Sequence, residues 1–281
     1  MRLPTMPSAE PTDVNPLIGV FDSGVGGLSI VRELLAVIPA HPLLYAADQA
    51  HLPYGVRPNT EIHQFVDAIT RWMISRGAQV IVLACNSASA AALHTLRADY
   101  PDFPFVGMEP AVKPAAQNTR SGVIGVLSTH ATASGDLFRA TAARYAADVR
   151  VIAQPAPELV RLVEMGTWNT DEGKGVLRRA ITPLLDAGAD QIALACTHFP
   201  FLIDALREIA GDGVTFVDPS PAVARQTRRV LDSLGLLRES GQPPRHTFHT
   251  TGDPDRLRQM IHRLIGIETS VKPLVWGSDL T

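Results

Sequence analysis

The feature that most constrains the fold of this 281-residue chain is a nine-residue segment that occurs twice. Residues 77–85 read Gly-Ala-Gln-Val-Ile-Val-Leu-Ala-Cys, and residues 188–196 read Gly-Ala-Asp-Gln-Ile-Ala-Leu-Ala-Cys. Six of the nine positions are identical, at a separation of 111 residues. The closing residues, Cys85 and Cys196, are the only cysteines of the chain. The repeat therefore indicates that both the fold and the chemistry are built in duplicate.

Two further segments recur in the same order around this repeat. Ile-Gly-Val at residues 18–20 returns at 124–126, and the Phe-Val…Glu-Pro segment at 105–110 is echoed by Phe-Val-Asp-Pro at 216–219. The recurrences have offsets of 106 to 111 residues. They predict a duplicated domain of about 100 residues per half, a size at which domains commonly fold.

Short apolar runs alternate with helical periodicity in each half. Strands are predicted at 17–21, 43–47, 80–84 and 105–107, and again at 123–127, 149–153, 191–195 and 214–217. Helices are predicted at 28–38, 60–75 and 88–98, and near 135–146, 157–165, 173–185, 201–209 and 221–234. Apolar strands that alternate with helices are typical of parallel sheets covered on both faces. We expect an α/β fold of two pseudo-symmetric domains, each a mostly parallel sheet flanked by helices, with the active site in the cleft between them.

The composition is that of an ordinary globular protein, with 46% hydrophobic and 19% charged residues and a net charge of −3. This balance gives no reason to expect a nucleic-acid or membrane partner, and no apolar run approaches the ~20 residues of a membrane span. Residues 1–16 carry four prolines and lack the apolar stretch of a signal peptide. We predict that they form a flexible N-terminal tail on a cytoplasmic protein.

Polar residues directly follow several predicted strands. Ligands bind beyond the carboxyl ends of parallel strands, so these residues should face one shared cleft. They are Asp22 and Ser23, Cys85 and Asn86, Thr129, and Cys196, Thr197 and His198. The lack of a secretion signal argues against a structural disulfide between the cysteines. The spacing of Cys196 and His198, with no second Cys/His cluster, argues against a structural zinc site, and no metal is expected.

Two matched thiols facing a ligand suit the inversion of a C–H centre. One thiolate removes the proton and the opposite thiol returns one from behind, a role open to cysteine because its ordinary pKa is about 8.5 and shifts readily. A pyridoxal-phosphate route needs a lysine for its Schiff base, and Lys113, Lys174 and Lys272 do not follow strands beside the matched motifs. Cofactor-free chemistry is favoured. A dithiol redox or thiol-sensing protein is the alternative, although it lacks a nearby resolving-cysteine motif.

The turn at residues 22–27, Asp-Ser-Gly-Val-Gly-Gly, is rich in glycine. It does not have the Walker or dinucleotide-binding spacing. Its backbone amides could instead hold a substrate carboxylate at the start of the following helix. The glycines also suit a tight strand-to-helix turn.

From about Leu17 to Arg263 the chain resembles the glutamate racemases, cofactor-independent racemases that supply D-glutamate for bacterial peptidoglycan. The motifs that carry the resemblance are residues 19–28, 53–55, 84–88, 195–200 and 250–254. The resemblance implies an isomerase that interconverts L- and D-glutamate without a cofactor, in a cytoplasmic homodimer. Aspartate or hydantoin racemases of the same superfamily remain alternatives. The Thr197-His198 pair argues for glutamate, by resemblance only.

The resemblance also implies roles for individual residues. Cys85 and Cys196 would be the acid–base pair, with Asp22 assisting Cys85, and His198 and Glu164 acting beside Cys196. Substrate contacts would come from Asp22, Ser23, Tyr54, Gly55, Asn86, Ser87, Thr197 and His198. We add Thr129 to these candidates because it follows a predicted strand. Ser87 replaces a common threonine, and Ala156-Pro157 replaces a common Cys-Pro ahead of Glu164. Glu164 could otherwise be a solvated helix residue.

We expect four segments along the chain. Residues 1–16 form the tail, residues 17–112 the N-terminal domain and residues 113–224 the C-terminal domain. The segment of about 225–281 is expected to pack back onto the N-terminal domain.

Overall fold

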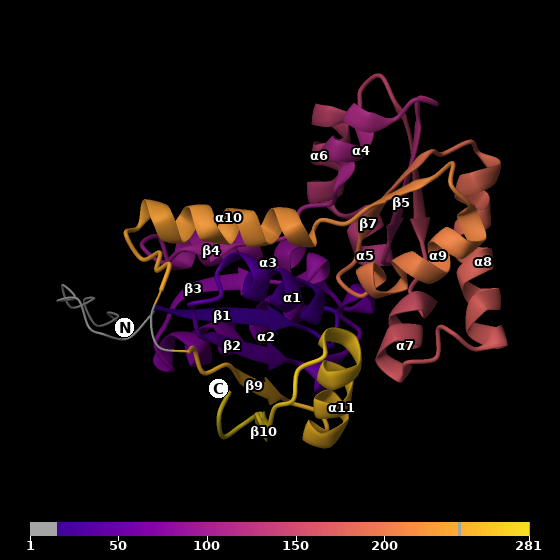
Figure 1. Ribbon diagram of the computed structural model, residues 1–281. Coiled ribbons are helices and arrows are strands. Elements are labelled where there is room, and N and C mark those ends of the chain that lie inside the picture. Colours follow the sequence, from indigo (N-terminus) through magenta and orange to yellow (C-terminus); the bar gives the residue numbers. More distant parts are fainter. Residues whose placement is uncertain (1–15, 241–242, 281) are drawn as a thin grey trace.

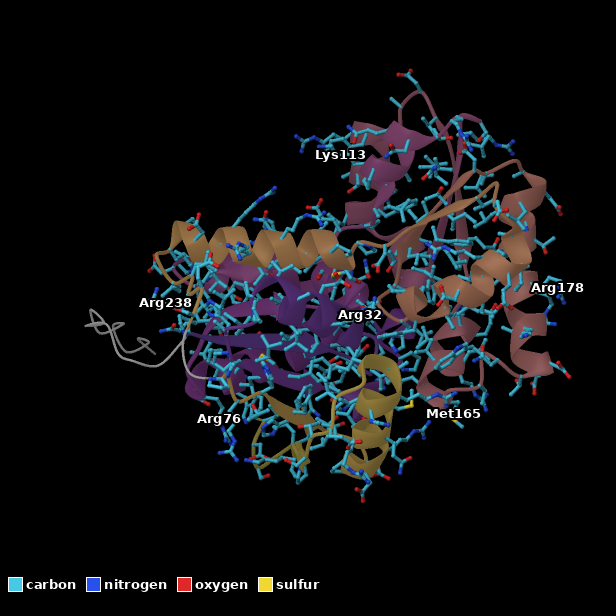
Figure 2. The ribbon with its side chains drawn as sticks, in the orientation of Figure 1. Arg32, Arg76, Lys113, Met165, Arg178 and Arg238 are labelled. Atoms are coloured by element: carbon cyan, nitrogen blue, oxygen red, sulfur yellow. The ribbon has the colours of Figure 1, made fainter. Side chains whose placement is uncertain are left out.

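A computed structural model describes residues 16–240 and 243–280, so the predicted tail lies outside the described residues except for Pro16. The chain forms two lobes, each built on a parallel sheet (Figure 1). Figure 2 shows side chains filling the space between the elements, while Arg76, Lys113 and Arg178 extend from the outer surface. Among the described residues, no helix is long and apolar enough to cross a bilayer.

The first lobe contains a six-stranded sheet in the order β10-β9-β2-β1-β3-β4, with every neighbouring pair parallel. Its strands are β1 (Leu17–Asp22), β2 (Leu43–Ala47), β3 (Ala78–Leu83), β4 (Phe105–Val106), β9 (Thr247–Thr250) and β10 (Val271–Pro273). The second lobe contains a four-stranded parallel sheet in the order β6-β5-β7-β8. Its strands are β5 (Val123–Ser128), β6 (Arg150–Pro155), β7 (Gln191–Ala195) and β8 (Thr215–Val217).

The duplication predicted from the sequence is visible in the strand order. The first sheet contains the run β2-β1-β3-β4 and the second is β6-β5-β7-β8, so the first four strands of each half are arranged alike. The expected α/β fold with two parallel sheets is confirmed. The first sheet differs by its two extra strands, β9 and β10, which extend it beyond β2.

Helices connect and cover these strands. In the first lobe they are α1 (Leu28–Val37), α2 (Asn59–Ser75), α3 (Asn86–Asp99), α10 (Ser220–Ser233) and α11 (Pro254–Ile265). In the second lobe they are α4 (Val112–Asn118), α5 (His130–Ser134), α6 (Asp136–Tyr145), α7 (Glu158–Met165), α8 (Asp171–Asp186) and α9 (Ile203–Ala210). Short 3-10 turns are η1 (Gln49–His51), η2 (Tyr54–Val56) and η3 (Phe199–Leu202). All eight predicted strands and all eight predicted helices are present within a few residues of the expected bounds.

The elements that the sequence did not predict are short or lie near the C-terminus. They are η1, η2, α4, α5, α11, β9 and β10, and β9 and β10 have only four and three residues. β9 pairs with β2, and α10 packs against α1. The bounds of the two domains stay a prediction.

Alternating strand residues divide the core of the first lobe between the two faces of its sheet. Ile18 and Val20 belong to one apolar cluster with α1, and Phe21 belongs to another with α2 and α3. This alternation is the two-residue period of a strand. The first cluster continues into the second lobe, where it includes Leu159 of α7 and Leu194 of β7. One apolar core therefore joins the two lobes.

Matched glycines in the repeated Ile-Gly-Val segments lie under crossing helices. A Cβ on Gly19 of β1 would lie 2.8 Å from Sδ of Met73 in α2, and one on Gly125 of β5 would lie 2.7 Å from Cδ1 of Leu184 in α8. Both facing side chains are fully buried. The repeated glycine is explained by close packing of a helix on the central strand of each sheet.

Gly125→Ala should lower the free energy of unfolding by about 1–3 kcal/mol, because the added methyl overpacks a core that Leu184 already fills. Urea denaturation measures this change. Gly213→Ala is the matched control, since nothing lies within 4 Å of a Cβ there and its φ is not positive. Equal unfolding free energies for the two variants would contradict the explanation.

Candidate active site

The carboxyl ends of the central strands of both sheets meet around one small cavity. Its volume is about 20 Å³, enough for a water-sized molecule but too small for an amino acid. Its lining consists of Ser23, Leu52, Pro53, Tyr54, Gly55, Cys85, Asn86, Ser87, Thr129, Val160, Cys196, Thr197 and His198. Ten of the twelve sequence-predicted site residues line it. The other two, Asp22 and Glu164, are buried behind the lining.

Cys85 lies between the end of β3 and the start of α3. Its Sγ accepts a hydrogen bond from Ala88 N at 3.5 Å and lies 3.7 Å from Ser23 Oγ. Burial raises the pKa of the Cys85 thiol to about 12, and the negative charge of Asp22 adds to the rise. In this buried setting Cys85 is therefore a protonated thiol at neutral pH.

Asp22 is the last residue of β1 and is fully buried. Its Oδ1 accepts from Gly24 N at 2.9 Å and Ser23 Oγ at 3.2 Å, while its Oδ2 accepts from Thr197 Oγ1 at 2.8 Å. Burial raises the pKa of Asp22 to about 6, and the hydrogen bonds and His198 limit the rise. Ser23 lies between Asp22 and Cys85 in the hydrogen-bond network, and Asp22 binds the second lobe directly through Thr197.

Cys196 follows β7 and has different neighbours from Cys85. Its Sγ lies 3.8 Å from His198 Nδ1, and His198 Nε2 lies 2.7 Å from Glu164 Oε1. Burial alone would lower the pKa of His198, but hydrogen bonds to Cys196 and Glu164 and their charges raise it well above its usual value. This thiol therefore has a cationic imidazole beside it, whereas Cys85 has a serine hydroxyl.

Glu164 is a buried residue of α7 rather than a solvated one, with 6% of its surface exposed. Its Oε1 also accepts from Val25 N at 2.8 Å, and its Oε2 accepts from Gln49 Nε2 at 3.2 Å. Burial by itself would raise the pKa of Glu164, but these donors and the charged His198 lower it. Glu164 is therefore an ionised carboxylate held by both lobes.

The glycine-rich turn joins β1 to α1, as a tight strand-to-helix turn would, and two of its amides bind protein carboxylates. Gly24 N donates to Asp22 and Val25 N donates to Glu164, so these two amides are committed to protein carboxylates and not to a substrate. The turn also contains no positive φ angle. A Cβ at Gly24 would collide with Glu164, and one at Gly26 with His198. The glycines allow the side chains of Glu164 and His198 to lie close to the backbone of the turn. The composition of the turn alone does not predict these contacts.

Another part of the cavity wall is formed by Asn86, Ser87, Thr129 and Gly55. Asn86 is 5% exposed, and neither its Oδ1 nor its Nδ2 has a partner among the described residues. Ser87 Oγ lies 3.5 Å from Thr129 Oγ1, against which Gly55 packs. A buried amide with no partner is costly unless something binds it, so Asn86 marks this wall as a place for a polar ligand.

Two further polar residues of the site region are not among those predicted from the sequence. Asp48 is buried and Gln49 is half-buried. Tyr54 donates its hydroxyl to Asp48 Oδ2 at 2.7 Å, which turns the phenol oxygen away from the role of a substrate donor. Asp48 also accepts from Thr251 Oγ1 at 2.7 Å and Trp276 Nε1 at 3.0 Å. Both residues directly follow the predicted strand at 43–47, so the strand-end rule could have found them.

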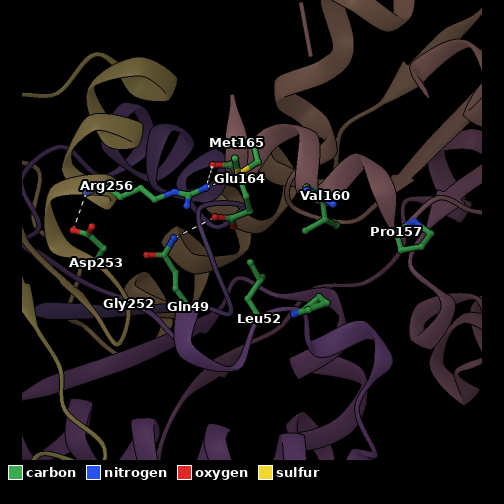
Figure 3. Close-up of a pocket in the computed structure, with 11 residues that line it drawn as sticks. Gln49, Leu52, Pro157, Val160, Glu164, Met165, Gly252, Asp253 and Arg256 are labelled. Atoms are coloured by element: carbon green, nitrogen blue, oxygen red, sulfur yellow. Dashed lines mark hydrogen bonds between the residues drawn. The ribbon is translucent and has the colours of Figure 1, made fainter. Parts of the chain in front are cut away.

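A larger pocket of about 460 Å³ lies beside the cavity (Figure 3). Leu52, Pro53 and Val160 line both spaces and so form the partition between them. Polar side chains on its wall include Gln49, Glu164 and Arg256. Nowhere in residues 16–240 or 243–280 do three or more His, Cys, Asp or Glu side chains gather as a candidate metal site.

Comparison with known proteins gives consistent matches. The family model for Asp/Glu/hydantoin racemases matches residues 19–227. A glutamate racemase of Roseiflexus sp. (strain RS-1) is 49% identical over 251 residues, which cover 88% of this chain and 91% of that protein. The structure of Escherichia coli glutamate racemase in complex with L-glutamate and the activator UDP-MurNAc-Ala aligns with a TM-score of 0.83 at 32% identity, covering 93% of this chain and 98% of that one. Francisella tularensis glutamate racemase in complex with D-glutamate aligns with a TM-score of 0.81 at 25% identity, covering 94% and 98%.

The raised pKa of Asp22 predicts a stability gain for Asp22→Asn that depends on pH. Between pH 4 and 6 the unfolded chain releases this proton while the folded protein keeps it, so folded stability falls as pH rises. The asparagine amide does not ionise, so the stability of the variant does not fall with pH for this reason. Its stability relative to the original protein should increase by about 3 kcal/mol from pH 4 to pH 7, a change of roughly two pKa units.

Urea unfolding of both proteins across this pH range measures the difference. The gain should level off above about pH 7, where the folded Asp22 is fully ionised. A stability difference that does not vary with pH would contradict a raised Asp22 pKa.

Proposed function

This chain belongs to the Asp/Glu/hydantoin racemase family, and we propose that it is a glutamate racemase working through two thiols. The observation that carries the proposal is that Cys85 and Cys196, from matched strand ends of the two sheets, line the same small cavity. The named relatives support glutamate as substrate, including the solved structures with L- and D-glutamate. The reaction is the interconversion of L- and D-glutamate.

The proton inventory of the reaction balances without an oxidant. One thiolate takes the α-proton and becomes a thiol, which leaves a carbanion at Cα. The opposite thiol then gives its own proton to the other face of Cα and becomes a thiolate. Because the carbanion is unstable in water, the site must exclude solvent and present hydrogen-bond donors to the developing charge. The small size of the cavity and the burial of the side chains around it meet this need.

The unlike neighbours of the thiols assign different assistance to each half-reaction. Beside Cys196, His198 supplies positive charge that stabilises a thiolate, and Glu164 keeps the imidazole oriented and charged. Beside Cys85, Ala88 N donates to the sulfur, while Ser23 donates its hydroxyl proton to Asp22 and so turns its oxygen toward the Cys85 thiol as an acceptor. In the cycle the enzyme therefore alternates between a thiolate at Cys196 with a thiol at Cys85 and the reverse.

The remaining lining residues are proposed as substrate contacts. Glutamate carries two carboxylates and an ammonium group, which need donors and acceptors respectively. The amide of Asn86 and the hydroxyls of Ser23, Ser87, Thr129 and Thr197 are of the right kind. Tyr54 and Gly55 contribute wall surface. Since the cavity is smaller than an amino acid, the lobes or the partition must move for glutamate to enter.

Three further assignments follow the resemblance to the relatives. The product D-glutamate would serve peptidoglycan synthesis in the cytoplasm, and the chain would act as a homodimer. Size-exclusion chromatography with light scattering tests the dimer. L-aspartate, assayed beside L-glutamate, tests the substrate against the alternative of aspartate racemisation.

Incubation of the purified protein with L-glutamate in heavy water should yield D-glutamate that carries deuterium at Cα. The returning proton comes from a thiol that has exchanged with solvent, so isotope enters as configuration inverts. Chiral chromatography with mass spectrometry measures both. Absence of any α-deuterium would rule out the proposed function.

Cys85→Ser and Cys196→Ser should each abolish racemisation, because a serine hydroxyl is far less acidic than a thiol. Elimination of chloride from 3-chloroglutamate needs only one α-proton abstraction. Each variant should therefore retain elimination from one enantiomer, and the two variants should prefer opposite enantiomers. Racemisation that survives either substitution would show that the paired-thiol mechanism is wrong.

Asn86→Ala should lower kcat/KM about 10- to 100-fold while leaving the fold as stable as before. A hydrogen bond to a charged group contributes about 1.5–3 kcal/mol, and truncating a buried amide that has no protein partner removes a desolvation cost. Steady-state kinetics and urea unfolding measure the two effects. A loss of stability together with activity would identify Asn86 as a structural residue instead.

A further inference from the structure

We propose that Gln49 is a positioning residue for the Cys196 side of the site, which holds the Glu164 carboxylate against His198 and acts on Cys196 through these two residues. The inference rests on the proposed racemase function. Gln49 does not line the small cavity. It lies on the wall of the larger pocket, beside the carboxylate of Glu164 (Figure 3).

The contact joins the two lobes. Gln49 begins η1, separated from the end of β2 in the first sheet by Asp48, and Glu164 lies in α7 of the second lobe. Gln49 Nε2 donates to Glu164 Oε2 at 3.2 Å. The other carboxylate oxygen, Oε1, already accepts from Val25 N and faces His198 Nε2. Within the part of the chain that the structure describes, Gln49 is the one hydrogen-bond donor to Oε2.

The orientation of the Gln49 amide is itself fixed. Gly252 N donates to Thr250 Oγ1 at 2.9 Å, which leaves the Thr250 hydroxyl proton free to be donated. Thr250 Oγ1 donates it to Gln49 Oε1 at 2.8 Å. With its oxygen used as an acceptor, Gln49 must present its NH₂ group to Glu164. Thr250, the last residue of β9, thus orients the Gln49 amide, and the Gln49 amide in turn holds the Glu164 carboxylate.

Gly252 adds a steric limit to the same arrangement. A Cβ at this position would lie 2.8 Å from Gln49 Cβ, closer than side chains normally approach. The glutamine therefore packs directly on the Gly252 backbone while Thr250 holds its amide. Residues 250–252 do not line the small cavity, but Thr250 and Gly252 hold the Gln49 side chain in place.

Loss of the Gln49 donor would free Glu164 to turn. The larger pocket adjoins the Oε2 side of the carboxylate and gives it room. Arg256 is an alternative partner there, because its Nη2 already lies 3.1 Å from the Glu164 backbone oxygen. A carboxylate that rotates toward Arg256 weakens its hydrogen bond to His198, and a less well paired imidazolium is a weaker support for the thiolate of Cys196.

The test uses Gln49→Met, which keeps the length of the side chain and removes its hydrogen bonds, and Thr250→Val, which keeps Gln49 and removes the hydroxyl that orients its amide and accepts from Gly252 N. Gln259→Met is the matched control, because Gln259 is exposed on α11. The equilibrium constant between enantiomers is one, so kcat/KM must fall equally in both directions. We expect a fall of about tenfold for Gln49→Met, the worth of one hydrogen bond to a charged group.

The direction-specific readout is the kinetic isotope effect with α-deuterated L- and D-glutamate. If Gln49 acts on Cys196, proton transfer at Cys196 becomes the slowest step. The isotope effect should then rise for the enantiomer whose α-proton faces Cys196 and shrink for the other. The alkaline limb of the pH profile of kcat/KM should also move to lower pH, because the charged form of His198 is less stabilised. Thr250→Val should show the same pattern more weakly.

The outcomes separate the inference from the proposed function. If the unmodified protein fails to racemise glutamate, the proposed function fails, whatever Gln49 does. If it racemises glutamate and Gln49→Met leaves the isotope effects symmetric and the pH profile unchanged, the positioning role is overturned even if activity falls. If Gln49→Met does not fold, Thr250→Val decides the question by the same two measurements.

Discussion

The hydrogen bonds that join the two lobes at the carboxyl ends of their strands are the interactions on which the rest of the site depends. Thr197 of the second lobe donates to Asp22 of the first, and Val25 of the first donates to Glu164 of the second. Both carboxylates are buried, so each is costly unless these donors are present. The bonds therefore define one relative placement of the two sheets, in which both thiols line a single cavity.

Much of this arrangement could be predicted from the sequence because it follows from periodicity and repetition. The repeated segments fixed the equivalence of β1 with β5 and of β3 with β7, and the strand-end rule then placed Cys85 and Cys196 at one edge. Glu164, by contrast, became a candidate only through family resemblance, since a carboxylate on a helix carries no sign of burial. Its burial depends on Gly24, whose side-chain-free backbone is in contact with it.

The parts that the sequence did not predict depend on contacts between distant segments. β9 has four residues, too few for a clear alternation, and its place beside β2 is set by pairing rather than by its own pattern. The glycines at 24 and 26 were interpreted as turn or anion-binding residues, yet their φ angles are ordinary and their use is steric. The roles of Asp48 and Gln49 cannot be predicted from the sequence because they depend on partners that are distant along the chain. Asp48 accepts from Tyr54 and Trp276, and Gln49 joins Thr250 to Glu164.

The two sheets are unequal, and this inequality bears on how such a duplicated protein can diverge. The strands β9 and β10 have no counterpart in the second sheet, and β9 ends at the threonine that reaches Gln49 and so Glu164. An extension at the edge of one half thereby contacts the chemistry of the other half. Mutation in that extension can adjust the surroundings of Cys196 while Ser23 and Ala88, the hydrogen-bond partners of Cys85, stay the same. The duplication gave the chain two similar acid–base groups, and the strands added at the edge of one sheet give them unlike surroundings.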